Sequence, residues 1–507
     1  MWQKTFSSVC PTCDRPLTGR LYEESGRILL EKQCPDHGTF RDLASSDAAL
    51  YRAKLEFAEA FDGGCSLPQC RKGVAACKLH RAQKAPISFI EITPRCNMQC
   101  PVCYIDASAK GTDVPFEKIE RIVQEIEKHD PETHVILIGG EPTLHADFFR
   151  ILAALRETGL IRRTWIATNG ITLGDEAFCR KVYEAGARWF YLAFDSTDRE
   201  ACKAIRGSYR SYEAPRKAIE NLRKFKRARV LLSVTAVKGV NDGTLADVVR
   251  FAMENRDVVR RISISAEVFC GRQTLVTDLI SRRITPECVE AKLCEGLGLS
   301  AVTVSLGHYG ALLKPLRAAG LVPEEAAVWA YSVPHPTCGS IGMLFEGKDG
   351  KIRSLLDFVF RNPREGLARL GQRMARLGAR IEARKARMAT GGFSRFLFRL
   401  LAIFYYLPLY LLVILMAAKP SFVLRALFAP LAALLTGRKT QDVLFGRKRI
   451  ELWYLLLCDK YNFMWDRMPN CATHHYRIDP ATNEVNKFCG CYIVPFREKA
   501  DSCHAIG

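Results

Sequence analysis

Short apolar runs alternate with amphipathic segments between residues 87 and 267, and this alternation is the clearest pattern in the chain. Runs of this length, rich in branched side chains, are typical of buried strands. In the segment 116–129 the apolar residues Ile119, Ile122, Val123 and Ile126 instead recur at helical spacing. The strands that the pattern predicts span 87–92, 135–140, 164–168, 189–194, 230–237 and 261–267.

Alternating strands and helices predict a parallel sheet with right-handed crossovers. Six such units suit an α/β fold, an open and partial (β/α)6 TIM-like barrel. In parallel βα folds the ligands gather at the carboxyl ends of the strands. We therefore expect the functional side chains directly after the predicted strands.

Cys96, Cys100 and Cys103 follow the first predicted strand in the run CNMQCPVCY. Thiolates at this C-x3-C-x2-C spacing are soft ligands suited to an iron–sulfur cluster. A [4Fe–4S] cluster takes four ligands and the motif supplies three, so one iron stays open to another molecule. The alternative is a zinc knuckle, which needs a fourth Cys or His close by. The residues after Cys103 offer none.

With this motif and the turn GGEP at 139–142, the chain resembles the radical SAM superfamily. The resemblance implies that S-adenosylmethionine binds the open iron of a [4Fe–4S] cluster and is cleaved to a 5′-deoxyadenosyl radical. Catalysis then rests on the three motif cysteines, and the strand ends contact the cofactor. The cofactor contacts expected are Tyr104, Gly139, Gly140, Glu141, Pro142, Thr168, Asn169, Asp195, Ser196 and Arg206.

Each of these contacts has its own chemistry. The glycines let the backbone approach the ligand, and Glu141 can face an ammonium group. Asn169 and the pair Asp195 and Ser196 suit ribose or carboxylate groups, and Ser233 or Thr235 is a weaker candidate. Arg206 can pair with the cofactor carboxylate bidentately. Tyr104 either shields the cluster or is a core aromatic residue.

The first 45 residues carry a second metal motif. Cys10 and Cys13 form one knuckle, and Cys34 with His37 forms the other in CPDHG. Four such donors fit a tetrahedral zinc ion or a rubredoxin-like iron. His37 also has a plain alternative, a turn residue beside Gly38.

The chain has 20 cysteines, far more than is usual, and we read them as metal ligands in a reducing cytosol. Those in helical runs are ordinary small apolar residues, and Cys270 and Cys458 stay undecided. Eight others lie in loops rich in Pro, Gly, His or Asn, enough for two auxiliary [4Fe–4S] clusters. These eight are Cys65, Cys70, Cys77, Cys338, Cys471, Cys489, Cys491 and Cys503.

The segment 361–399 is a basic amphipathic helix, with an arginine every three or four residues. The uncharged run 400–418 follows it, and a second apolar run covers 422–435. The net charge of +20 requires an acidic partner, nucleic acid or an anionic membrane surface. Basic flanks on both sides predict a re-entrant or monotopic hairpin at the cytoplasmic face of the membrane. Two full spans, a buried core hairpin and an RNA-binding helix are the alternatives.

The order of motifs resembles the tetraether lipid synthase family of radical SAM enzymes. It runs from CPTC…CPDHG through the three-cysteine loop, CNMQCPVCY and HPTC to DKYNFMWDRMPNCATHHY…KFCGC. The resemblance implies extra iron–sulfur clusters, a rubredoxin-like centre and C–C coupling of unactivated lipid tails. It also implies a membrane lipid substrate and an electron donor such as ferredoxin or flavodoxin, with no nucleic acid.

Three other functions stay open at this point. They are a radical SAM methylase of a pterin-like small molecule, a peptide-modifying radical SAM enzyme with auxiliary clusters, and an iron–sulfur electron carrier. The expected organisation is a metal module (1–60), an auxiliary cluster loop (61–86), the barrel (87–300), a substrate-linked segment (301–360), the basic helix and apolar hairpin (361–450), and a C-terminal cluster-binding region (451–507).

Overall fold

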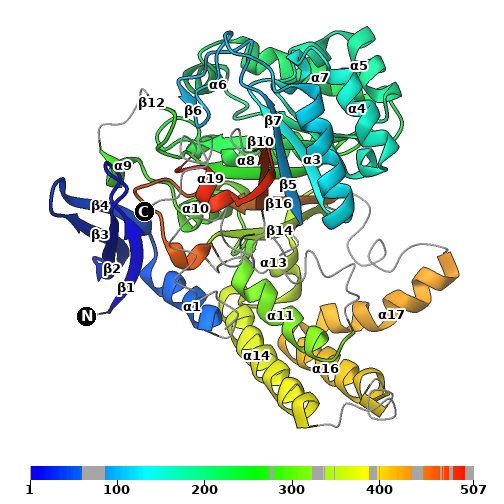
Figure 1. Ribbon diagram of the computed structural model, residues 1–507. Coiled ribbons are helices and arrows are strands. Elements are labelled where there is room, and N and C mark those ends of the chain that lie inside the picture. Colours follow the sequence, from blue (N-terminus) through cyan, green and yellow to red (C-terminus); the bar gives the residue numbers. More distant parts are fainter. Residues whose placement is uncertain are drawn as a thin grey trace.

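The computed structural model shows a small antiparallel sheet, a large barrel-like sheet with helices around it, and a group of long helices below (Figure 1). It describes residues 2–59, 86–273, 278–321, 335, 337–347, 349–387, 397–398, 400–436, 449–468, 471, 473–478 and 483–496.

The N-terminal sheet contains β1 (Gln3–Val9), β2 (Pro16–Glu24), β3 (Arg27–Cys34) and β4 (Gly38–Ser45), paired antiparallel in chain order. Helix α1 (Ala48–Glu59) covers it, and Phe6, Leu21, Ile28 and Tyr51 are buried between them. The two knuckles of the metal motif are the turns β1–β2 and β3–β4. The sheet therefore presents both knuckles at one end.

The barrel follows the prediction from the apolar runs, and its α/β class is confirmed. Six parallel strands lie in the order β5, β7, β8, β9, β10 and β11. Helix α3 covers the outside and buries Ile119, Val123 and Ile126 against the sheet. The strands are β5 (Ile87–Thr93), β7 (His134–Gly139), β8 (Trp165–Thr168), β9 (Trp189–Ala193), β10 (Arg229–Ala236) and β11 (Val259–Ala266), and the outer helices are α3 (Phe116–His129), α4 (Phe148–Glu157), α5 (Glu176–Glu184), α6 (Arg199–Arg206), α7 (Arg210–Arg223) and α8 (Leu245–Glu254).

Strands from the last third of the chain extend this sheet at both edges. Strand β16 (Arg449–Leu455) lies parallel to β11, and β17 (Thr473–Ile478) lies parallel to β5. Further out, β14 (Gly339–Glu346) pairs with β16, and β18 (Val485–Cys489) pairs with β17. The segments expected to be separate cluster-binding pieces thus form walls of the barrel.

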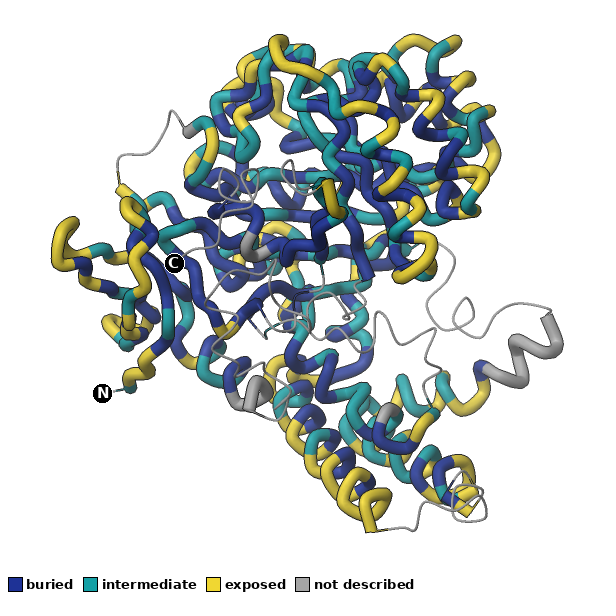
Figure 2. The backbone as a smooth tube through the Cα atoms, viewed as in Figure 1, coloured by how far each residue is buried: buried dark blue, intermediate teal, exposed yellow. Residues whose placement is uncertain are grey.

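The long helices pack beside the barrel as a second small core. The basic segment forms α14 (Pro363–Arg387), whose face with Leu370, Met374, Leu377 and Ile381 is buried against α11 (Leu306–Ala318) and α16 (Leu407–Ala417). Its arginine stripe is exposed (Figure 2). Helix α17 (Pro420–Thr436) follows α16.

The predicted membrane hairpin, and with it the predicted location at the cytoplasmic membrane face, is wrong. The apolar run breaks into a π-helical turn, Ala402–Tyr406, and the eleven-residue helix α16, which ends at Ala417. Lys419 then ties the chain to the protein body through bonds to Val359 O and Asp357 O. Within the described part of the chain, no helix has both the length and the apolar character needed to cross a membrane. One side of the run, including Ala402, Tyr406 and Leu409, packs into the core beside α14, whereas Ile403, Phe404, Leu412 and Met416 on its other side are exposed.

Candidate active site

The three motif cysteines lie on the loop that leaves β5 at the carboxyl end of the barrel. Cys96 and Cys100 are buried and Cys103 is partly exposed. A cubane cluster binds each thiolate through a different iron, so three cysteines of one loop can hold three of its irons.

A segment far from the motif in sequence, Gly271 and Arg272, holds this loop in place. Arg272 donates to Cys100 O (3.0 Å) and Ala107 O (2.6 Å) and pairs with Asp106 (2.7 Å). Gly271 has φ +63°, and a Cβ there would lie 2.4 Å from Cys103 O. Only glycine allows this approach, so the segment after β11 clamps the cluster loop.

Burial sets the protonation of the unliganded thiols. It raises the pKa of Cys96 to about 11 and also raises the pKa of Cys100 above its ordinary value. Because the thiolate is the ligand, cluster binding must release these protons. Rising pH therefore favours cluster assembly.

The GGEP turn lies directly against the cluster loop. A Cβ at Gly139 or Gly140 would lie 2.1 Å from Thr93 O or Arg95 O respectively, and both glycines line the cavity described below. Glu141 is buried behind the turn. Its carboxylate accepts hydrogen bonds from Thr143 Oγ1 (2.6 Å) and from the backbone N–H of Asn169 (2.8 Å). Its carboxylate positions the next strand end, while glycine backbone forms the surface open to a cofactor. Pro142 starts a short 3₁₀ turn behind it.

Asn169, after β8, reaches the cluster loop. Its side-chain amide donates to Asn97 Oδ1 (2.7 Å) and lies 4.0 Å from Cys96 Sγ. Thr168 accepts from the Gly170 amide (3.0 Å) and lines the same cavity. Both predicted residues therefore line the cavity beside the cluster loop.

Arg206 and Asp195 form a bidentate pair at the ends of α6 and β9, with Asp195 buried and Arg206 partly exposed. Arg206 Nε and Nη2 lie 2.6 and 3.0 Å from the two oxygens of Asp195, which also accepts from the Thr235 amide (2.8 Å). The Asp195 and Cys100 groups raise the pKa of Arg206 against the effect of burial. Arg206 faces the cavity, whereas Asp195 and Ser196 lie behind it, and Ser196 bonds Thr244 (2.8 Å).

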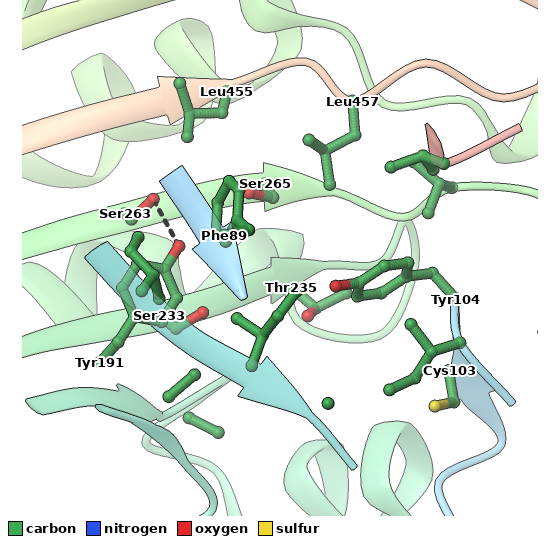
Figure 3. A pocket seen from close by; sticks show the side chains of 18 of the residues that line it. Phe89, Cys103, Tyr104, Tyr191, Ser233, Thr235, Ser263, Ser265, Leu455 and Leu457 are labelled. Atoms are coloured by element: carbon green, nitrogen blue, oxygen red, sulfur yellow. Dashed lines mark hydrogen bonds between the residues drawn. The ribbon is translucent and has the colours of Figure 1, made fainter. Parts of the chain in front are cut away.

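A cavity of about 300 Å³ runs from the cysteine loop into the barrel (Figure 3). Tyr104 extends over it from the cluster loop, and Thr235 lies near the Tyr104 ring. Leu455 and Leu457, from the segment of β16, form one wall. Among the described lining residues, Arg206 is the only permanently charged side chain.

The four predicted donors of the N-terminal motif meet at the end of the small sheet. All lie within 4.8 Å of one another, with Cys13 Sγ 3.9 Å from Cys34 Sγ and His37 Nδ1 3.5 Å from Cys34 Sγ. Zn–S bonds of about 2.3 Å place tetrahedral sulfurs about 3.8 Å apart. Cys10, Cys13, Cys34 and His37 therefore fit one tetrahedral ion, and His37 is more than a turn residue.

The candidate auxiliary-cluster cysteines are only partly described. Cys471 and Cys489 are buried in one apolar cluster with Cys458, which the sequence left undecided. Cys338 and Cys458 both lie near the buried Arg467 guanidinium. Cys491 is placed in α19 (Gly490–Ile493), and Cys65, Cys70, Cys77 and Cys503 lie outside the described residues. The assignment of two auxiliary clusters stays a prediction.

Sequence reasoning missed the residues that come to the cavity from distant strands. Ser263 and Ser265 were read only as part of a strand, and Trp453, Leu455 and His475 were not considered as site residues. The period-two spacing of the serines in RISISAE was a signal for one shared face. Nothing local marks Leu455 or His475, because strand pairing alone brings them to the cavity.

Two family models match the chain. The model of the Radical SAM superfamily matches residues 90–252, and the model of the HMPTM N-terminal zinc ribbon domain matches residues 2–46. The two matches coincide with the barrel and the N-terminal sheet. They confirm S-adenosylmethionine and a [4Fe–4S] cluster as the cofactors that the family implies, and the ribbon donors fit a further metal.

Curated relatives agree with the family models. A "7,8-dihydro-6-hydroxymethylpterin dimethyltransferase" of Methanocaldococcus jannaschii is 31% identical over 365 residues, which are 70% of this chain and 71% of that protein. A "Probable GTP 3',8-cyclase" of Pyrococcus horikoshii is 29% identical over 178 residues, 34% of this chain and 54% of that protein.

A solved structure, Streptococcus suis SuiB, aligns with a TM-score of 0.32 at 16% identity, covering 51% of this chain and 63% of that one. That likeness is too low to carry an argument. The cluster loop, the family models and the archaeal relative lead to one conclusion: the chain belongs to the radical SAM superfamily, in the family of that relative.

Proposed function

We propose that the protein methylates a pterin-like small molecule by radical SAM chemistry. The single observation that carries this proposal is the likeness to the archaeal pterin dimethyltransferase, which extends over two thirds of both chains. A cavity of about 300 Å³ next to the cysteine loop has the volume of a small-molecule site.

The residues of the chain have separable tasks in this proposal. When bound, the cluster and S-adenosylmethionine supply a carbon radical able to abstract hydrogen from an unactivated carbon. Cys96, Cys100 and Cys103 hold the cluster, and Arg206 and Asn169 orient the cofactor beside it. The apolar walls exclude water, which protects a reactive intermediate from side reactions. The reducing electron comes from a protein donor of the ferredoxin or flavodoxin kind.

The test is turnover by the anaerobically reconstituted protein with S-adenosylmethionine, a reductant and 7,8-dihydro-6-hydroxymethylpterin. The expected product is a pterin in which one C–H bond is replaced by C–CH3, detected by mass spectrometry. One S-adenosylmethionine leaves as 5′-deoxyadenosine and methionine, a second supplies the methyl group and leaves as S-adenosylhomocysteine, and the reductant supplies two electrons. Cys100→Ala is the control that should form neither product nor 5′-deoxyadenosine. Deoxyadenosine with unchanged pterin would contradict the substrate but not the chemistry.

A second candidate, C–C coupling of lipid tails, is favoured by the lining of the cavity. Aliphatic and aromatic side chains dominate it, and none of the described lining residues is a carboxylate. Coupling breaks one C–H bond in each tail and forms one C–C bond. Both hydrogens leave in deoxyadenosine, so two S-adenosylmethionine molecules and two electrons from the donor are used. The resemblance to the tetraether lipid synthases stays a hypothesis of this kind.

The two candidates separate in one experiment. A total lipid extract replaces the pterin in the same reaction, and mass spectrometry then seeks products that join two tails with the loss of two hydrogens. A joined lipid together with an unchanged pterin would replace the first proposal by the second. A methylated pterin with unchanged lipid would retain the first.

A further inference from the structure

The lining of the barrel cavity contains two kinds of side chain. Phe89, Leu455 and Leu457 are apolar, and beside them lies a group of hydroxyls from β9, β10 and β11 (Figure 3). We call this group the hydroxyl wall. It consists of Tyr191, Ser233, Thr235, Ser263 and Ser265.

Strand register makes the hydroxyl wall continuous. Ser233 lies opposite Ser263, and Thr235 lies opposite Ser265, across the β10–β11 pair. Alternate residues of a strand share a face, so all four point to the interior. The residues between them, such as Val234 and Ile264, are buried against the outer helices.

The packing of the barrel interior does not require hydroxyl side chains at these positions. The interior of a parallel barrel is usually filled by branched apolar side chains, and a buried hydroxyl costs free energy unless it is hydrogen-bonded. Here small serines leave the interior hollow. The Tyr191 hydroxyl donates to Ser263 Oγ at 3.1 Å, and Arg206 Nη2 donates to Thr235 Oγ1 at 3.3 Å. Ser233 and Ser265 are only half-buried and border the cavity.

The wall is also neutral. Arg206, the only permanently charged side chain among the described lining residues, already pairs with Asp195. His134, deeper in the barrel, accepts a bond from Trp165 Nε1, and burial lowers its pKa to about 4. A hydroxyl both donates and accepts. A neutral group with a carbonyl, amide or hydroxyl matches these donors and acceptors better than an ion.

Resting on the proposed function, we propose that the hydroxyl wall binds an uncharged carbonyl, amide or hydroxyl group of the substrate. The apolar side chains that adjoin it, such as Leu455 next to Ser265, then take the hydrocarbon part, and the hydroxyl wall fixes which carbon faces the cluster. Tyr191, Ser233, Ser263 and Ser265 are therefore specificity-determining residues. Thr235 accepts a hydrogen bond from Arg206 and therefore also belongs to the cofactor end of the cavity.

Binding to the holoenzyme, measured by calorimetry, tests the proposal without requiring turnover. Two probe pairs of matched size are used. One is 6-hydroxymethylpterin against 2-ethylnaphthalene, which has two fused rings and no polar atom, and the other is methyl nonanoate against undecane. In one of the two pairs, we expect the polar member to bind about tenfold more tightly than the apolar member. A tenfold ratio corresponds to the free energy of one to two neutral hydrogen bonds. The double variant Ser233→Ala/Ser265→Ala should lose that preference.

Ser88→Ala is the matched control, because Ser88 lies on β5 and bonds Thr133 (2.9 Å) without lining the cavity. It should retain the preference. Equal binding within both pairs by the unaltered protein, or a preference that survives the double variant, would overturn the proposal. Tighter binding of the pterin, with no methylated product in the turnover test, would contradict the proposed function alone. The proposal for the hydroxyl wall would remain.

Discussion

The cofactor end of the barrel and the junction between the ribbon and the C-terminal segment are built in different ways. At the cofactor end, motifs directly after β5, β7 and β8 meet because parallel strands bring their carboxyl ends together. At the junction, Ser8 donates to Phe463 O (2.6 Å) and Lys32 donates to Lys460 O (2.6 Å), across more than 400 residues. The cofactor end therefore carries its chemistry in local motifs. The junction instead joins distant parts of the chain that enclose this chemistry.

A buried charge group is the centre of that junction. Arg283, after α9 (Leu279–Arg282), pairs with Asp42 of β4 and with Asp459 after β16, and all three are buried. Lys32 lies near both carboxylates, and burial lowers its pKa to about 8. The ribbon, barrel and C-terminal segment each supply one member, so the group holds three parts of the chain in one arrangement.

Removing a cluster ligand should have the largest effect and should leave the junction intact. Cys100→Ala is expected to reduce 5′-deoxyadenosine formation to background and to lower the iron content of the barrel site. Cys179→Ala is the control, because Cys179 lies on the buried face of α5. This variant should retain both deoxyadenosine formation and the iron content. Deoxyadenosine formation by Cys100→Ala at the unaltered rate would remove this residue from the cluster.

Breaking the junction should instead cost stability. Arg283→Met removes the guanidinium that pairs with two buried carboxylates, and we expect the free energy of unfolding to fall by about 3–5 kcal/mol in urea titrations. Arg223→Met, which breaks the exposed pair with Asp257, is the comparison and should cost about 1 kcal/mol or less. Similar losses in the two variants would mean that the buried group does not hold the junction.

A glycine pair tests how tightly the cluster loop is clamped. Gly271→Ala places a Cβ 2.4 Å from Cys103 O, whereas Gly239→Ala has nothing within 4 Å at a similar φ of +75°. Both pay about 1 kcal/mol for the left-handed backbone. Only Gly271→Ala should also lower cluster loading, measured by iron and sulfide content. Equal iron and sulfide content in both variants would show that the cluster loop moves to accept the added Cβ without losing the cluster.

The smallest effect expected is a pH dependence at the closed end of the barrel. Burial lowers the pKa of His134 to about 4, so the folded protein binds fewer protons than the unfolded chain between pH 4 and 6.5. Stability from this residue is therefore present above pH 6.5 and is lost as the pH falls toward 4. At pH 5 the loss should be about 1–2 kcal/mol, and His134→Gln should flatten the dependence in unfolding titrations.

The same contrast explains what the sequence could predict. The strands of the barrel, the cysteine loop and the ribbon donors follow from spacing and periodicity within a few tens of residues. Leu455 and His475 reach the cavity only because β16 and β17 pair with β11 and β5, and such pairing has no local signal. Hydropathy likewise cannot distinguish the run at 400–418 from a membrane segment, because an apolar face packed on α14 and one in lipid have the same composition.

The edge positions of β16 and β17 also have a consequence for biosynthesis. The six central strands of the barrel, which include those before the cofactor motifs, are complete at Ala266, whereas the two outer strands are complete only at Leu455 and Ile478. Because N-terminal parts fold first during synthesis, the cysteine loop can form on the ribosome long before the walls that enclose its chemistry. A nascent or truncated chain ending before β16 would thus carry the cluster ligands with an open barrel. Cells that make this protein therefore benefit if the cluster is inserted only after the chain is released.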